Sequence, residues 1–145
     1  MTSTEERTGS CLCGAVNITI KIDATDLGVC HCHVRRRWAG GPFMEIECDS
    51  GVSFGGEENI SVYSSSSWAE RGFCRHCGSH LFVKEKDNNH YGIPPGLFDS
   101  TQDLKLTRQV FFDRKPNYYA FADNTRNISS EYIYRHHPHL QEHRD

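Results

Sequence analysis

The sequence lacks long apolar segments. No stretch approaches the roughly 18 consecutive apolar residues of a membrane-spanning helix. Met1 to Ser10 is polar and charged, whereas a secretory signal peptide has an apolar centre. These absences predict a soluble cytoplasmic protein with reduced thiols and no membrane partner.

Positive charge is also scarce. The chain has 16 Lys and Arg residues against 19 Asp and Glu, a formal net charge of -3. Nucleic-acid-binding domains usually present a basic face, so the charge balance argues against a nucleic-acid partner. The aromatic residues between positions 111 and 121 are therefore predicted to form core and pocket wall rather than a base-stacking platform.

Apolar residues make up only 37% of the 145 residues, which is lean for a domain of this length. A structural zinc ion would compensate, because its binding adds on the order of 10 kcal/mol to folding. Cysteine supplies the ligands: there are seven cysteines, an odd number that a complete disulfide framework would not use. Close cysteine pairs in a reducing compartment favour metal binding over disulfides.

The sequence shows neither internal repeats nor an amphipathic helix of convincing length. It contains many short segments in which apolar and polar residues alternate, as from Cys11 to Ile22 and from Phe43 to Cys48. Alternation of this kind is typical of half-buried strands. We therefore predict an all-β fold, with a disordered N-terminus over residues 1–8, a single domain over 9–134 and a flexible histidine-rich tail over 135–145.

Two cysteine pairs predict a structural metal site. Cys74 and Cys77 form a Cys-x-x-Cys turn followed by Gly78, and Cys11 and Cys13 share one face of the predicted first strand. Zinc takes four tetrahedral ligands, and thiolates are its commonest structural donors. The alternatives are a redox dithiol or unligated buried thiols, although the βαβ context of a thioredoxin-like motif is missing.

A third pair, Cys30 and Cys32, offers a second site. Two thiolates are too few to hold zinc firmly, so a third donor is needed, either His33 or Cys48. An open fourth position would then make the site catalytic in type. The alternative is a pair of ordinary buried cysteines.

A basic run follows this pair. Arg35, Arg36 and Arg37 are suited to binding a substrate carboxylate through charge-assisted hydrogen bonds, and Trp38 would line the pocket before the turn at Gly40 and Gly41. A solvated basic turn and a core tryptophan are the competing interpretations.

These motifs resemble those of the family that contains the glutathione-dependent formaldehyde-activating enzyme and centromere protein V. The resemblance runs from about Gly9 to Tyr134. It is carried by Gly9-Ser10-Cys11-x-Cys13-Gly14, by Cys30-His31-Cys32 with Arg36-Arg37-Trp38-x-Gly40-Gly41, by Gly72-Phe73-Cys74-x-x-Cys77-Gly78-Ser79, and by Gly96-Leu97-Phe98-Asp99.

The resemblance implies a β-tent of small antiparallel sheets with a structural zinc on Cys11, Cys13, Cys74 and Cys77. It also implies a second zinc on a Cys-x-Cys-x-x-Cys motif. It further implies carbon–sulfur lyase chemistry on a small-molecule substrate, glutathione or a glutathione adduct. Homodimer formation stays open.

This chain departs from the family pattern at one telling position. The third cysteine of the second motif would fall at position 35, where Arg35 stands, and a guanidinium cannot coordinate zinc. The site therefore recruits another ligand, works without metal through Cys30, Cys32 and Arg35, or is inactive. In the last case the chain would be a zinc-binding interaction module instead of an enzyme.

Overall fold

The computed structural model describes residues 5–22 and 25–142. Within them the chain consists mainly of short strands, as the alternating pattern predicts. It forms two compact units, and each is built from two separate stretches of sequence. The first unit comprises the described part of Met1–Thr25 together with Ile46–Leu104, and the second comprises Asp26–Glu45 with the described part of Lys105–Asp145.

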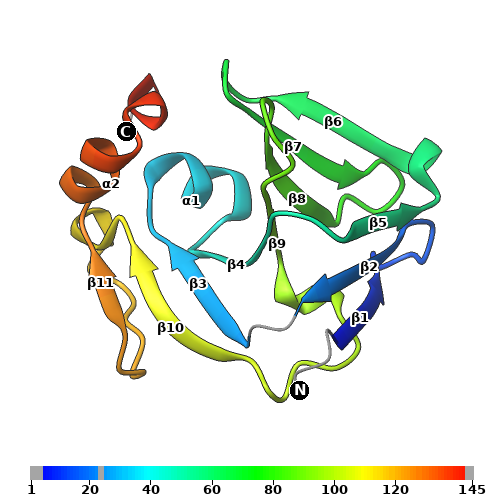
Figure 1. The fold of residues 1–145 in the computed structure, drawn as a ribbon, viewed down its shortest axis with the longest axis horizontal. Coiled ribbons are helices and arrows are strands. Elements are labelled where there is room, and N and C mark those ends of the chain that lie inside the picture. Colours follow the sequence, from blue (N-terminus) through cyan, green and yellow to red (C-terminus); the bar gives the residue numbers. More distant parts are fainter. Residues whose placement is uncertain (1–4, 23–24, 143–145) are drawn as a thin grey trace. The chain divides into compact units, whose positions relative to one another are not determined.

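The first unit contains a three-stranded antiparallel sheet in the order β1-β2-β5 (Figure 1). Its strands are β1 (Glu5–Ser10), β2 (Asn17–Ile22) and β5 (Val52–Gly55). Ile18 and Ile20 of β2 are buried and alternate with more exposed residues. This confirms the prediction of a half-buried strand, although the strand begins only at Asn17.

The same unit holds a second antiparallel arrangement, in which β6, β7, β8 and β9 follow one another and β9 pairs with the end of β4. These strands are β4 (Phe43–Cys48), β6 (Ile60–Ser64), β7 (Ala69–Cys74), β8 (His80–Glu85) and β9 (Tyr91–Ile93). The short helices η1 (Glu57–Asn59) and η2 (Pro95–Leu97) lie between them in sequence. The rings of Phe54, Phe82 and Tyr91 pack on one another, with centroids 5.3–6.2 Å apart.

The second unit is organised by β10 (Lys105–Val110), which lies between β3 (Asp26–Cys30) and β11 (Arg126–Ile128) and runs parallel to both (Figure 1). On its other side β3 pairs with the beginning of β4, antiparallel. The parallel register places Cys30 opposite Val110. The end of β3, where the second cysteine motif begins, thereby meets the segment that follows β10.

Two seven-residue helices belong to this unit, α1 (His33–Ala39) and α2 (Ser130–His136), together with η3 (Phe112–Arg114) and η4 (Pro138–Glu142). The Ser129 side chain caps α2 by accepting a hydrogen bond from the Tyr132 backbone N–H. Asp113 accepts hydrogen bonds from both the backbone N–H and the hydroxyl of Ser130. These bonds tie the start of α2 to η3.

The structure differs from the predicted boundaries at both ends. Residues 5–8 belong to β1 and not to a disordered terminus, and residues 135–142 include the end of α2 and all of η4. Residues 1–4 and 143–145 of the two predicted terminal segments lie outside the described residues. The predicted single domain is divided between the two units. Among the helices that the structure describes, none is long and apolar enough to cross a membrane.

Candidate functional site

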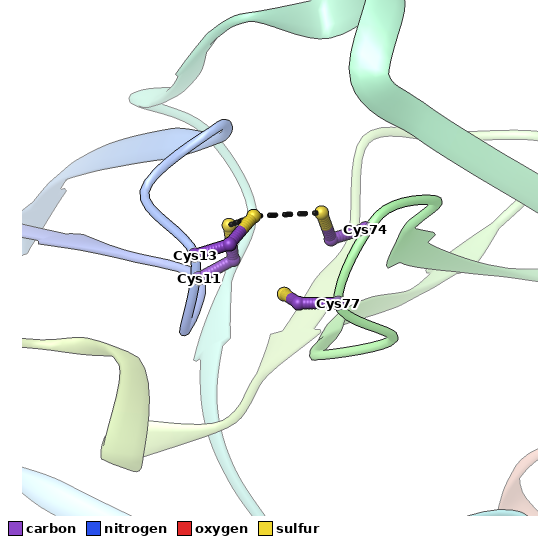
Figure 2. A group of neighbouring side chains, drawn as sticks. All are labelled: Cys11, Cys13, Cys74 and Cys77. Atoms are coloured by element: carbon purple, nitrogen blue, oxygen red, sulfur yellow. Dashed lines mark hydrogen bonds between the residues drawn. The ribbon is translucent and has the colours of Figure 1, made fainter.

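Four cysteines of the first unit converge on one point. The sulfurs of Cys11, Cys13, Cys74 and Cys77 all lie within 4.8 Å of one another, and Figure 2 shows them turned toward a common centre from two separate loops. Cys13 Sγ is 3.7 Å from both Cys11 Sγ and Cys74 Sγ. The two cysteine pairs are therefore brought together as the sequence predicted, and this cluster could hold a metal ion.

Each pair is presented by a tight turn that ends in glycine. Gly14 N–H donates to Cys11 O over 3.1 Å, and Gly78 N–H donates to Cys74 O over 2.8 Å. Both glycines have positive φ, 82° and 78°, in the left-handed region that side chains disfavour. The Cys-x-Cys-Gly and Cys-x-x-Cys-Gly spacings thus specify two tight loops. Each loop directs both of its sulfurs toward the shared cluster.

Polar groups contact two of the sulfurs and favour the thiolate form at Cys77, whereas at Cys13 a backbone hydrogen bond is outweighed by desolvation and the neighbouring sulfurs, which raise its pKa to about 11. Val16 N–H donates to Cys11 Sγ over 3.3 Å. The Ser79 hydroxyl lies 3.2 Å from Cys77 Sγ and accepts from Leu12 N–H over 3.0 Å, so it bridges the two loops. Hydrogen bonds from the Ser79 hydroxyl and backbone lower the pKa of the Cys77 thiol to about 5. Metal ligands must be deprotonated, and these bonds assist that.

The cluster fits a tetrahedral zinc. A Zn–S distance of about 2.3 Å places the four sulfurs of a tetrahedral site about 3.8 Å apart. The distances from Cys13 Sγ to Cys11 Sγ and Cys74 Sγ, both 3.7 Å, match this spacing. Four sulfur donors with no remaining open position are typical of structural rather than catalytic sites.

The second cysteine pair lies in the second unit and is buried. Cys30 and Cys32 are 0% and 8% exposed and pack against Phe111, which is 7% exposed. Ile133 and Tyr134 of α2 pack against the same group. The C-terminal helix therefore contributes to the surroundings of a motif that lies 100 residues earlier.

Phe111 takes up an unusual backbone conformation. Its φ is +54°, in the left-handed region, where a bulky residue is a genuine outlier. Strain of this kind costs on the order of 1–3 kcal/mol and tends to cluster at functional sites. The conformation ends β10 and leaves the Phe111 ring against the cysteines, with the Tyr134 ring edge-on to it at 5.5 Å.

Arg35 is directed back toward the cysteine pair. It lies in the first turn of α1, and its backbone N–H donates to Cys32 Sγ over 3.4 Å, so Cys32 caps the helix. Its guanidinium forms an ion pair with the buried carboxylate of Glu45, N to O 3.8 Å, and lies 5.9 Å from the ring centre of Phe43. Burial opposes the charge, but Glu45, Cys30 and Cys32 together hold the pKa of Arg35 well above its usual range.

The pKa of the Cys30 thiol is raised as well, which for a thiol favours the neutral form. Burial raises its pKa well above the ordinary value, and Cys32 adds to that effect, while the positive charge of Arg35 lowers it. Because burial is the largest of these effects, the environment of Cys30 favours the neutral thiol over the thiolate.

The remaining predicted residues take different places. Arg36 Nε donates to His31 O over 2.8 Å, and Arg37 contacts His33 Nε2 at 2.9 Å on the exposed side of α1. The Trp38 ring packs on Phe43 with centroids 5.6 Å apart. Gly40 ends α1 in a left-handed conformation, and a side chain at Gly41 would meet no atom within 4 Å.

His31 is the centre of a directional chain of hydrogen bonds. Gln109 Nε2 donates to Thr125 Oγ1, whose hydroxyl donates to Asn127 Oδ1. Gln109 Oε1 is then an acceptor, so His31 Nε2 must carry the hydrogen of the 2.7 Å contact between them. Nδ1 of the neutral ring accepts from the Tyr119 hydroxyl over 2.8 Å. The segment after η3 is tied to the second cysteine motif through this chain.

A second metal site is not assembled in the same way. Within residues 5–22 and 25–142, the four-cysteine cluster is the single group of three or more histidine, cysteine or acidic ligands found close together. Cys48 belongs to the first unit, where burial and then Asp49 raise its pKa to about 11. His33 contacts Arg37. A second zinc through either residue stays a prediction.

Sequence reasoning missed most of the neighbours of the second pair. Glu45, His31 and Gln109 were not predicted to be functional, and Phe111 and Tyr119 were predicted only as core and pocket wall. One signal existed for Glu45, which shares a face with Phe43 in the predicted strand and would therefore be a buried charge in need of a partner. For the other residues the contacts come from the parallel pairing of β3 with β10, which no local pattern reveals.

Comparisons with known proteins agree with this picture. A family model described as glutathione-dependent formaldehyde-activating enzyme matches residues 6–114. An uncharacterized lyase of Schizosaccharomyces pombe is 39% identical over 121 residues, which cover 83% of this chain and 88% of that protein. A crystal structure of a Rhodobacter sphaeroides protein matches with a TM-score of 0.56 and 26% identity, over 64% of this chain and 88% of that one. The four-cysteine cluster, the fold and these matches together show that the chain belongs to the glutathione-dependent formaldehyde-activating enzyme family.

Proposed function

We propose that this chain is a cytoplasmic, zinc-containing enzyme of the carbon–sulfur lyase type. It makes or breaks a bond between a thiol, such as glutathione, and an electrophilic carbon of a small molecule. The family match and the lyase-named relative support this class of reaction. The single observation that carries it is Arg35, whose backbone N–H donates to Cys32 Sγ and whose mostly buried side chain places its positive charge beside Cys30 and Cys32.

The two cysteine sites have separate roles in this proposal. Zinc on Cys11, Cys13, Cys74 and Cys77 is structural, because four sulfurs leave no position for a substrate. The reaction takes place in the second unit. In the forming direction a thiol sulfur bonds to a carbonyl carbon, the C=O π bond breaks, and the thiol proton ends on the former carbonyl oxygen. Cleavage is the reverse.

The residues of the second unit would assist this reaction by charge and position. The Arg35 guanidinium stabilises negative charge on the reacting sulfur. Cys32, the less buried of the two cysteines, contacts this reacting sulfur. Arg36 donates from Nε to His31 O, and its terminal nitrogens would bind a substrate carboxylate. Arg37 adds positive charge nearby.

The loop after these residues would complete the substrate site. Trp38, packed on Phe43, forms part of its wall. Gly40 and Gly41 leave room for the substrate, because an added side chain at either residue would meet no atom within 4 Å.

The test is a direct assay of adduct formation. Zinc-loaded protein is mixed with glutathione and formaldehyde, or with a panel of small aldehydes, and the carbon–sulfur adduct is followed by NMR above the spontaneous rate. We expect Cys32→Ala to lower the enzymatic rate by about 100-fold or more. Tyr63→Phe, an exposed change on β6, serves as the control. Wild-type protein that gives no acceleration with any aldehyde would instead favour the zinc-binding interaction module.

A further inference from the structure

The resemblance to the family implies a second zinc held by three cysteines, and the residues present do not fit it. The third ligand position is occupied by Arg35, which has no lone pair for a metal. We propose that the guanidinium of Arg35, held by Glu45, takes the place of the second metal ion, so that this chain binds one zinc and not two. The proposal deepens the proposed function, because it names the cation on which the carbon–sulfur chemistry depends.

Geometry places the positive charge where the ion would be expected. Arg35 follows Cys32 by three residues in the first turn of α1, and its backbone N–H is bonded to Cys32 Sγ. The side chain is mostly buried and interacts electrostatically with the sulfurs of both Cys30 and Cys32. A divalent ion between these sulfurs would lie beside a permanent positive charge in a region with little water, and the two would repel each other strongly.

Glu45 explains how a charged arginine is tolerated there. Glu45 is 6% exposed, and its carboxylate forms the 3.8 Å ion pair with Arg35. The register of β3 and β4 places Glu45 opposite Gly28, two residues before Cys30. A buried carboxylate at this point is costly unless it meets a cation, so Glu45 and Arg35 depend on each other. Glu45 is in this sense a positioning residue.

The nearby histidine does not replace the missing ligand. His33 Nε2 is 2.9 Å from an Arg37 nitrogen, four residues further along the exposed side of α1. Its ring is thus directed along the helix. His31 is equally committed, because both ring nitrogens are bonded to Gln109 and Tyr119. Neither histidine of the motif therefore acts as the third ligand. Arg35 is the cation that lies next to the cysteine pair.

The metal content of three proteins tests the proposal without any assay of activity. Wild type, Arg35→Ser and Arg35→Cys are purified with excess zinc, desalted, and analysed for zinc per chain. Serine and cysteine have nearly the same size, so the two variants differ in the presence of a third sulfur. We expect one zinc in the wild type, one in Arg35→Ser and two in Arg35→Cys.

Two outcomes would overturn the proposal. Two zinc ions in the wild type would show that the site recruits another ligand despite Arg35. One zinc in Arg35→Cys, with the variant folded as judged by its unfolding transition, would show that Arg35 is not what excludes the metal. If Arg35→Cys does not fold, Cys30→Ser decides, since it should leave the zinc content of an otherwise wild-type chain unchanged. A failure of the adduct assay alone would remove the proposed function and leave these stoichiometries intact.

Discussion

The side chains of His31 and Gln109 meet at 2.7 Å although 78 residues separate them in the sequence. His31 is fully buried and Gln109 is 3% exposed. Burial first, and then Lys115 and Arg36, lower the pKa of His31, so the ring is neutral near pH 7. A neutral histidine with one donor and one acceptor nitrogen fits the fixed direction of the chain, in which each group donates to the next from Tyr119 to Asn127.

Removing the acceptor of this pair should destabilise the second unit. In Gln109→Ala the buried Nε2–H of His31 loses its partner, and a buried unsatisfied donor costs about 1–3 kcal/mol. Urea unfolding of the whole chain measures the difference. Asn127→Ala, at the exposed end of the same chain of bonds, is the control and should change stability by less than about 0.5 kcal/mol. Equal effects of the two changes would contradict the role given to His31.

His90 should make stability depend on pH. Its ring contacts Glu47 Oε1 at 3.3 Å and Asp49 Oδ1 at 2.5 Å, and these carboxylates, Glu47 first, raise its pKa from 6.5 to about 9. Because the folded-state value is the higher one, the stabilisation is fully present below pH 6.5 and is lost as pH rises through 9. Unfolding free energies measured between pH 6 and pH 10 should fall across this window.

The His90→Gln variant isolates that effect. It should lose the part of the pH dependence that lies between pH 6.5 and pH 9, whereas His76→Gln, whose ring contacts the neutral Asn59, should retain it. A His90→Gln curve parallel to that of the wild type would exclude the ion pairs as the source.

Removing metal should unfold the first unit. The four-cysteine cluster joins the turn before β2 to the turn after β7, and binding of structural zinc supplies on the order of 10 kcal/mol. A strong chelator should therefore abolish the cooperative unfolding transition, and added zinc should restore it. Cys74→Ser should bind zinc much more weakly and melt at a lower temperature. A chelated chain with an unchanged transition would contradict a structural role for the cluster.

A single methyl group at Gly9 should also be poorly tolerated. A Cβ at this position in β1 would lie 2.0 Å from the carbonyl oxygen of Leu97, a backbone atom that cannot rotate away. The Gly9→Ala variant should lose about 1–3 kcal/mol of stability by overpacking. Gly96→Ala, one residue before Leu97, would meet no atom within 4 Å and serves as the matched control. Differential scanning calorimetry of both variants tests the contrast.

Local patterns predicted part of this structure well. The alternation in β2 predicted a half-buried strand, because a period of two determines which side chains face the core. They did not predict β1, since Glu5–Ser10 has no apolar alternation and becomes a strand by pairing with β2. The two short helices were also missed, because seven residues are too few for a clear helical period.

The sequence by itself determined the four-cysteine cluster and the family. Each cysteine pair with its following glycine specifies a tight turn, and the four sulfurs then meet in one group that could hold a metal ion. Tertiary structure alone decided the second site. Parallel pairing of β3 with β10 brings Phe111, Gln109 and the C-terminal helix to Cys30 and Cys32, and pairing with β4 brings Glu45 to Arg35. For the contacts made through β10, the physical reason is that parallel neighbours are joined through long connections, so a contact such as that of His31 with Gln109, 78 residues away, leaves no periodic signal in the chain.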